Sequence, residues 1–268
     1  MLGAMTTSSG GPTVAEPTPR DGTSPRTVRA VVRSGYVLAL SLCVGAAVEG
    51  ALDEQRGRAG LAWGLAFALT AAVLLLVLPR LSSLWLLGVA GRSSATSHNL
   101  AAAIALSGNR IGVGIVLSHC FYGADLTTFL TSLAFVPVAF VALVAMQWLY
   151  VRLTHYSDAQ EIQGENAAAA LCFAGITVAF SIIVGNAAWG EFTGWRSSLV
   201  RFGIALLLAL GLYPVRQLVV KGVLLGLRPT ARGGELDRAI AQDRDVTIGA
   251  VEGLAYIAAA LLLTGVAP

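Results

Sequence analysis

Two ionisable side chains stand inside apolar stretches of this chain, where a charge is costly to bury. Arg110 lies about eleven residues into one apolar segment, and Glu252 lies one or two turns into another. Charged groups within a bilayer usually pair with each other or serve a transport pathway. We therefore predict an ion pair between Arg110 and Glu252, which either satisfies two buried charges or lines a polar passage.

Three apolar segments begin directly after a short polar side chain: Asn99, Asn166 and Asp245. Such a side chain can accept a hydrogen bond from an unpaired backbone amide of the first helical turn, so helix capping is the simplest prediction. A second interpretation is that several helix N-termini, each with a partial positive charge, gather at one membrane face. Together they would bind an anion or a lipid head group.

The far ends of the same segments carry His119, Asn186 and Thr264 at corresponding positions. A repeated polar layer forms either a gate or a contact with lipid head groups, and we favour the head groups. The sequence contains no phosphate-binding loop, no supported catalytic triad and no paired histidines at ligand spacing. We therefore expect neither an enzyme, nor a cofactor, nor a metal site.

The elements that position these residues are long enough to cross a bilayer. The chain of 268 residues is 56% hydrophobic and only 12% charged, whereas a soluble domain has about 25% charged residues. A membrane-spanning helix needs ~20 apolar residues. Seven segments of about that length predict an all-α polytopic transmembrane helical bundle: about 31–52, 61–78, 100–121, 127–149, 167–189, 199–223 and 247–266.

Three stretches at the margins of these segments need separate treatment. Residues 1–28 are rich in Ser, Thr, Pro and Gly, and we expect a disordered cytoplasmic tail. The segment that follows is either a retained helix or a signal peptide cleaved after Ala46. Residues 81–90 are apolar but too short to cross, so they either lie in the interface or extend the second helix. The cysteines are expected to be small buried hydrophobes rather than ligands: Cys43, Cys120 and Cys172.

Two of the segments start with nearly the same sequence, which predicts an internal repeat. Shifting residue 99 onto residue 166 aligns Gly108 with Gly175 and matches small residues with small ones along the helix. Small side chains let helices approach closely in lipid, where burial gives little drive for association. The third copy, from Asp245, is weaker. We predict tandem helix hairpins in two units, residues 29–121 with three helices and residues 122–268 with four.

The basic residues predict the orientation of the bundle. Most of them fall in connections that share one side if the N-terminal tail is cytoplasmic. By the positive-inside rule we predict a cytoplasmic N-terminus and, after seven crossings, a C-terminus outside. The formal charge of +3 does not indicate nucleic acid, because the basic residues lie between apolar runs rather than in a cluster.

A pattern around the second asparagine resembles a known family. The residues that carry it are Leu149, Tyr150, Leu153, Thr154, Asp158, Glu161, Ile162, Asn166, Ala168, Ala169 and Gly175. They resemble the bacterial inner-membrane family called domain of unknown function 350. The family's unit of two helix hairpins is similar to residues 127–266, and residues 31–121 look like a second unit without its first helix. The resemblance implies the fold and the membrane, because no activity is settled for the family.

Two classes of function fit these observations. The first is a membrane scaffold or stress-linked accessory protein that binds lipid, a cytoplasmic protein or a second copy of itself, and we favour it because transport chemistry is sparse. The second is a small channel or ion-coupled transporter that uses Arg110, Glu252 and the asparagine-led helix starts. A dry helix core favours the first class, whereas a continuous water-lined cavity favours the second.

Overall fold

The computed structural model of the protein describes residues 24–51, 57–87, 98–121, 123, 125–189, 194–211, 218, 221–222, 226 and 234–266. Most of the predicted tail lies outside the described residues, as does much of the second half of the predicted segment 199–223. Residues 25–28, which we assigned to the tail, already belong to the first helix.

Six helices are long and apolar enough to cross a membrane, and each corresponds to one predicted segment. They are α1 (Pro25–Ala51), α2 (Gly57–Leu86), α4 (Leu100–Cys120), α5 (Leu126–Leu153), α7 (Ala167–Ala188) and α11 (Val246–Val266). Helix α8 (Trp195–Leu210) covers the first part of the remaining segment, and the short helices α6 (Asp158–Gln163) and α10 (Glu235–Ala241) lie between spans. The described residues contain no strand. The all-α, multi-pass fold is therefore confirmed, while a seventh crossing stays a prediction.

Helix α2 decides between the alternatives for residues 81–90. It continues past Pro79 to Leu86, so residues 81–86 of this stretch extend the second helix, while residues 88–90 lie outside the described residues. The hydroxyl groups of Ser82 and Ser83 donate to the carbonyl oxygen of Pro79, at 3.2 and 2.6 Å. These bonds add to the hydrogen bonding of the Pro79 carbonyl, whereas the carbonyl that Pro79 leaves without an amide donor is that of Leu75, one turn earlier.

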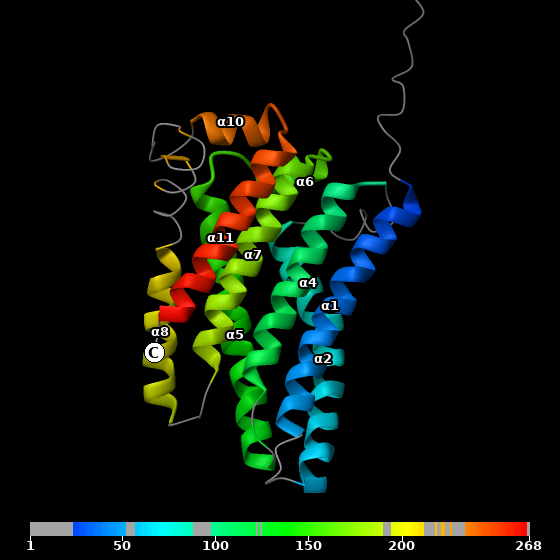
Figure 1. Ribbon diagram of the computed structural model, residues 1–268, viewed down its shortest axis with the longest axis vertical. Coiled ribbons are helices and arrows are strands. Elements are labelled where there is room, and N and C mark those ends of the chain that lie inside the picture. The colour runs from blue at the N-terminus through cyan, green and yellow to red at the C-terminus, as the bar shows by residue number, and fades with distance from the viewer. Residues whose placement is uncertain are drawn as a thin grey trace, which may run out of the picture.

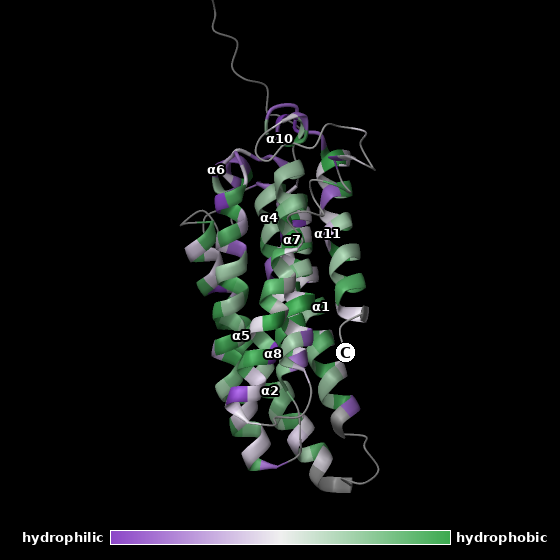
Figure 2. Cartoon of the chain, turned by 90° about the vertical axis from the view of Figure 1, so that its left-hand side faces the viewer, coloured by the Kyte–Doolittle hydropathy of each residue, from purple (hydrophilic) through white to green (hydrophobic). Residues whose placement is uncertain are grey.

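The spanning helices form two layers. Helices α1, α4, α7 and α11 lie side by side in that order, and α2, α5 and α8 pack behind them (Figure 1). Hydrophobic residues predominate along the helices, and hydrophilic residues gather at the end that carries α6 and α10 (Figure 2). A bilayer requires such a long apolar stretch of a spanning bundle. We call the polar end with α6 and α10 the α6/α10 end.

The first layer is held together by small residues at each crossing. A Cβ atom added at Gly114 of α4 would lie 2.7 Å from the Cα atom of Ala39 in α1. One added at Gly108 would lie 2.7 Å from the Cα atom of Ala174 in α7. Gly175 meets the backbone of Gly253 in α11 in the same way. The prediction of close packing through small side chains is thus confirmed, and α4 and α7 are the most buried spans because both of their sides are covered.

Candidate functional site

Asn99 does two jobs at the start of α4. Its Oδ1 atom accepts a hydrogen bond from the amide of Ala102 at 2.8 Å, which caps the helix. Its Nδ2 atom donates to the carbonyl oxygens of Ile162, at 2.8 Å, and Gln163, at 3.3 Å, both in α6. The side chain is buried. Its one amide group caps the start of α4 and also joins α4 to the short helix of the next hairpin.

Asn166 repeats this arrangement at the start of α7. Its Oδ1 atom accepts from the amide of Ala169 at 3.2 Å, and its Nδ2 atom donates to the carbonyl oxygen of Ile240 in α10 at 2.8 Å. The same Nδ2 atom also donates to Oε2 of Glu161 at 2.9 Å. Capping by both asparagines is therefore confirmed, and the corresponding contacts support the predicted repeat. Because their amide groups are buried and engaged, neither offers an open anion site.

Asp245 at the start of α11 only caps. Its Oδ1 atom accepts from the amides of Thr247, at 2.9 Å, and Ile248, at 3.2 Å, and the residue is exposed. An ionised carboxylate has no proton to donate. Asp245 can therefore cap α11, but it cannot make the second bond that the Nδ2 atoms of Asn99 and Asn166 make.

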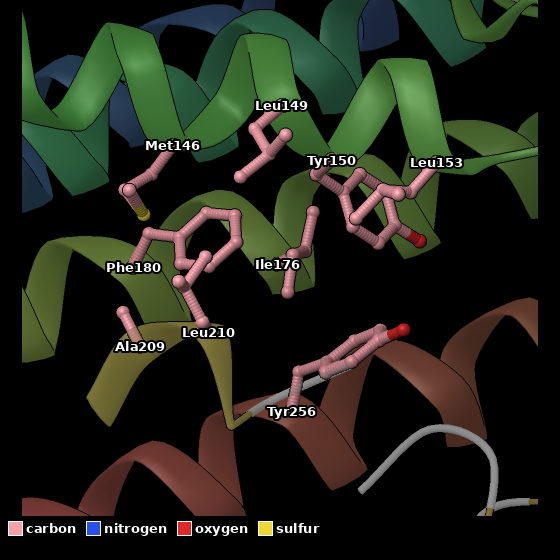
Figure 3. A pocket seen from close by; sticks show the side chains of 9 residues that line it. All are labelled: Met146, Leu149, Tyr150, Leu153, Ile176, Phe180, Ala209, Leu210 and Tyr256. Carbon is pink, nitrogen blue, oxygen red and sulfur yellow. The ribbon is translucent and has the colours of Figure 1, made fainter. Parts of the chain in front are cut away.

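An apolar cavity of about 200 Å³ lies between α5, α7, α8 and α11. Figure 3 shows the side chains that line it. Its apolar walls come from Met146, Leu149, Ile176, Phe180, Ala209 and Leu210. The four helices therefore leave a space between their side chains, in contrast with the close crossings of α4 and α7.

The same cavity has a polar end. Tyr150 and Tyr256 meet edge to face, with ring centroids 5.8 Å apart, and both hydroxyl groups lie on the side away from Met146 (Figure 3). The hydroxyl of Tyr256 donates to Oε1 of Glu252 at 3.1 Å, and the hydroxyl of Tyr150 lies 3.2 Å from Sγ of Cys172. Glu252 is fully buried one turn before Tyr256. The cavity is thus amphipathic, with a long apolar part and hydrogen-bonding groups at one end.

Residues 124–267, more than half of the chain, match the family described as Domain of Unknown Function (DUF350). The chain belongs to the DUF350 family. No curated protein and no solved structure matches it. The matched residues of this DUF350 protein include Asn166 and the whole lining of the cavity, whereas Asn99, Arg110 and His119 precede them.

The predicted ion pair between Arg110 and Glu252 is wrong. Nη1 of Arg110 donates to the backbone carbonyl of Val32 in α1. Glu252 lies on α11, and α7 stands between α11 and α4 (Figure 1). Sequence position fixes how deep a residue lies in the membrane but not which neighbour its helix face meets, and the order of the helices separates these two residues. Arg110 and Glu252 therefore belong to different candidate sites of this DUF350 protein.

His119 and Asn186 lie at the end of the bundle opposite to α6 and α10. Nδ1 of His119 lies 2.8 Å from the carbonyl oxygen of Ile115 and 3.2 Å from Oγ of Ser118, and its ring meets Trp189 edge to face at 6.2 Å. The backbone carbonyl of Asn186 accepts from the amide of Trp189 at 3.3 Å. His119 is thus held by its own helix and packed beside a tryptophan, as in a residue layer near head groups.

Sequence reasoning missed Tyr150 and Tyr256 as site residues and misjudged Lys221. The tyrosines look like ordinary residues of apolar helices, and only the fold brings them face to face. Lys221, one of the basic residues from which we predicted the orientation, is 1% exposed. Its position inside an apolar run was the available signal, because a buried lysine in a membrane segment is expensive and usually functional.

Proposed function

We propose that this DUF350 protein is a bacterial inner-membrane protein that acts by binding a membrane lipid, rather than by catalysis, with its N-terminus in the cytoplasm and its C-terminus outside. The observation that carries the proposal is the amphipathic cavity between α5, α7, α8 and α11. The positive-inside distribution of arginines supports the orientation. The rigid layer of α4 and α7 would serve as the scaffold that holds the cavity open.

The chemistry of the cavity matches a lipid. Its walls are apolar, and within the bilayer the protein is surrounded by lipid acyl chains. An acyl chain is therefore the most abundant apolar occupant available to the cavity. A volume of about 200 Å³ is smaller than the ~300–1,000 Å³ of sites for drug-sized ligands. It suits a segment of one chain, while the hydroxyls of Tyr150 and Tyr256 meet a polar group of the lipid.

The packing of the first layer supports binding rather than conduction. Backbones meet where Gly108 faces Ala174 and where Gly175 faces Gly253, so these crossings leave no space for a water-filled passage. A pore needs a continuous polar lining. The polar groups of the cavity instead gather at one end of an otherwise apolar space.

Filling the cavity is expected to expel the lipid. Ala209 lines the cavity and is 1% exposed, whereas Leu207 on the same helix is 68% exposed. We expect Ala209→Phe to lower the amount of lipid retained through detergent purification about tenfold, which corresponds to 1.4 kcal/mol of binding free energy. Native mass spectrometry measures the retained lipid, and Leu207→Phe, which adds a ring to the outer surface, is expected to retain it like the unaltered protein.

A melting curve for each variant shows whether the bundle is intact. If Ala209→Phe melts like Leu207→Phe and still carries the same lipid, lipid binding in this cavity is wrong.

A second candidate function, an ion-coupled carrier, is favoured by one observation. Glu252 and Lys221 are both almost completely buried in the apolar part of the chain, and ionisable groups in that setting often serve ion movement. Liposomes that contain the purified protein would then show an ion flux that Glu252→Gln removes. The lipid-binding proposal expects no such flux from either protein.

A further inference from the structure

A second group of charges lies in the half of the bundle that precedes the family match, and it is independent of the cavity. Arg110 is half-buried on α4, and its Nη1 atom donates to the backbone carbonyl of Val32 in α1. Arg80 is exposed on α2, and its charge acts on the guanidinium group of Arg110. Three helices, α1, α2 and α4, therefore meet around two arginines.

The contact between α2 and α4 at this point is well fixed. Asn109 is buried, and its Nδ2 atom donates to the carbonyl oxygen of Pro79 at 3.1 Å and to Oγ of Ser82 at 2.8 Å. Arg80 and Arg110 directly follow Pro79 and Asn109 in the sequence. The same hydrogen bonds that join the two helices thus hold the two cations near each other.

These two cations have no acidic partner in the part of the chain that the structure describes. Of the two groups that interact electrostatically with Arg110, Arg80 is a cation and Tyr36 is a phenol that is uncharged at neutral pH. Glu49, the acidic residue at the far end of α1, lies seventeen residues beyond Val32, which is about 25 Å along a helix. The connection between α2 and α4, residues 88–97, contains no Asp or Glu.

The later half of the chain shows what the same position looks like without charge. A shift of 67 residues, which takes Asn99 to Asn166, also takes Arg80 to Gln147 and Arg110 to Thr177. Gln147 and Thr177 are buried and hydrogen-bonded to each other, with Nε2 and Oγ1 3.0 Å apart. A neutral donor and acceptor hydrogen-bond to each other directly at this position, whereas two guanidinium groups repel each other and together attract an anion.

The depth of the two arginines below the membrane surface fits binding to the phosphate of a lipid head group. Arg80 lies six residues before the end of α2, about 9 Å along the helix, and Arg110 lies ten residues after the start of α4, about 15 Å along it. Both helix ends belong to the α6/α10 end. Arg29 and Arg33, exposed on the first turns of α1, continue the positive charge toward that surface.

We propose that Arg80 and Arg110 form a binding site for a phosphate group between α1, α2 and α4, and that an anionic phospholipid supplies it. Arginine binds phosphate oxygens through charge-assisted hydrogen bonds. The exposed side chain of Arg80 opens the site to lipid, so a phospholipid reaches it from within the bilayer.

The test compares lipids on the purified protein in detergent. Phosphatidylglycerol is expected to raise the melting temperature, and zwitterionic phosphatidylcholine is not. The double variant Arg80→Gln with Arg110→Thr copies the neutral pair of the later half. It is expected to bind phosphatidylglycerol about thirtyfold more weakly, because it lacks two arginines and each arginine near the surface contributes about 1 kcal/mol to anionic-lipid binding. In phosphatidylcholine it is expected to melt above the unaltered protein, since the repulsion is gone.

Two controls keep the result interpretable. Arg196→Thr removes one positive charge from an exposed position of α8, away from α1, α2 and α4. It is expected to leave the phosphatidylglycerol effect unchanged. Arg80→Gln alone keeps the contact of Arg110 with Val32. If the double variant does not fold, this single variant is compared instead, and a smaller phosphatidylglycerol effect is expected. An undiminished phosphatidylglycerol effect in the arginine variants would overturn the site. An equal effect of inorganic phosphate on the unaltered protein would leave the phosphate site standing and overturn the lipid as its source.

Discussion

Gly175→Leu is expected to separate α7 from α11 and to lower the free energy of unfolding by about 3 kcal/mol or more. The Cα atom of this glycine faces the backbone of Gly253, and even a Cβ atom would lie 2.7 Å from the carbonyl carbon of Gly253. Backbone cannot move aside as a flexible side chain can, so the whole helix must shift. Titration of the detergent-solubilised protein with a denaturing detergent measures the loss.

Gly45→Leu is the matched control, because nothing lies within 4 Å of a Cβ atom built at this exposed glycine of α1. The same substitution in a spanning helix is expected to change the unfolding free energy little, since it adds an apolar side chain on the lipid-facing side. Equal losses at Gly175 and Gly45 would show that helix flexibility, and not the crossing with α11, sets the effect.

Asn166→Asp is expected to cost about 3 kcal/mol of stability, the cost typical of a buried charge left without compensation. The carboxylate would keep the cap on Ala169 but could not donate to the carbonyl oxygen of Ile240. It would also place a second negative charge beside Oε2 of Glu161, which now accepts from Asn166 at 2.9 Å. Chemical denaturation of the purified variant at neutral pH measures the change.

The reciprocal substitution, Asp245→Asn, supplies the comparison. Asp245 is exposed and only caps α11, a role that asparagine fills equally well. We expect its stability to stay within about 0.5 kcal/mol of the unaltered protein, as for other exposed positions. Should Asn166→Asp also stay within that range, the bond between α7 and α10 does not hold the hairpins together.

The spans, the caps and the small-residue crossings could be predicted from the sequence because each depends on local pattern. Hydropathy over ~20 residues marks a span, and an asparagine before an apolar run marks a cap. The cross-hairpin donation by Asn99 and Asn166 could have been inferred as well. Asparagine is both acceptor and donor, so an asparagine at a buried helix start can cap its own helix and donate to a neighbouring one.

The partners of Arg110 and Glu252 could not be predicted in the same way. Both residues were recognised as costly charges, but hydropathy gives no lateral order of helices, and the layer places α7 between them. The cavity could not be predicted from the sequence either, because its lining depends on the lateral order of the helices. Tyr150 and Tyr256 are 106 residues apart in the sequence, and their edge-to-face contact exists only because α5 and α11 both pack near α7.

The contact of α4 with α7 fixes the order of the first layer, and it places the helix start capped by Asn99 beside the one capped by Asn166. Cross-linking tests this contact most directly. A Cβ atom built at Gly112 would lie 3.5 Å from the Cβ atom of Ser181, within the ~3.5–4.5 Å that a disulfide requires. Gly112→Cys with Ser181→Cys, in a chain with its three own cysteines replaced by alanine and a protease site inserted at Gly123, provides the test.

After oxidation in membranes and cleavage, we predict that the two fragments stay joined on a denaturing gel until a reductant is added. The pair Gly45→Cys with Ser181→Cys is expected to give two separate fragments with or without reductant. Separate fragments from the Gly112 and Ser181 pair under both conditions would contradict the helix order on which this account depends.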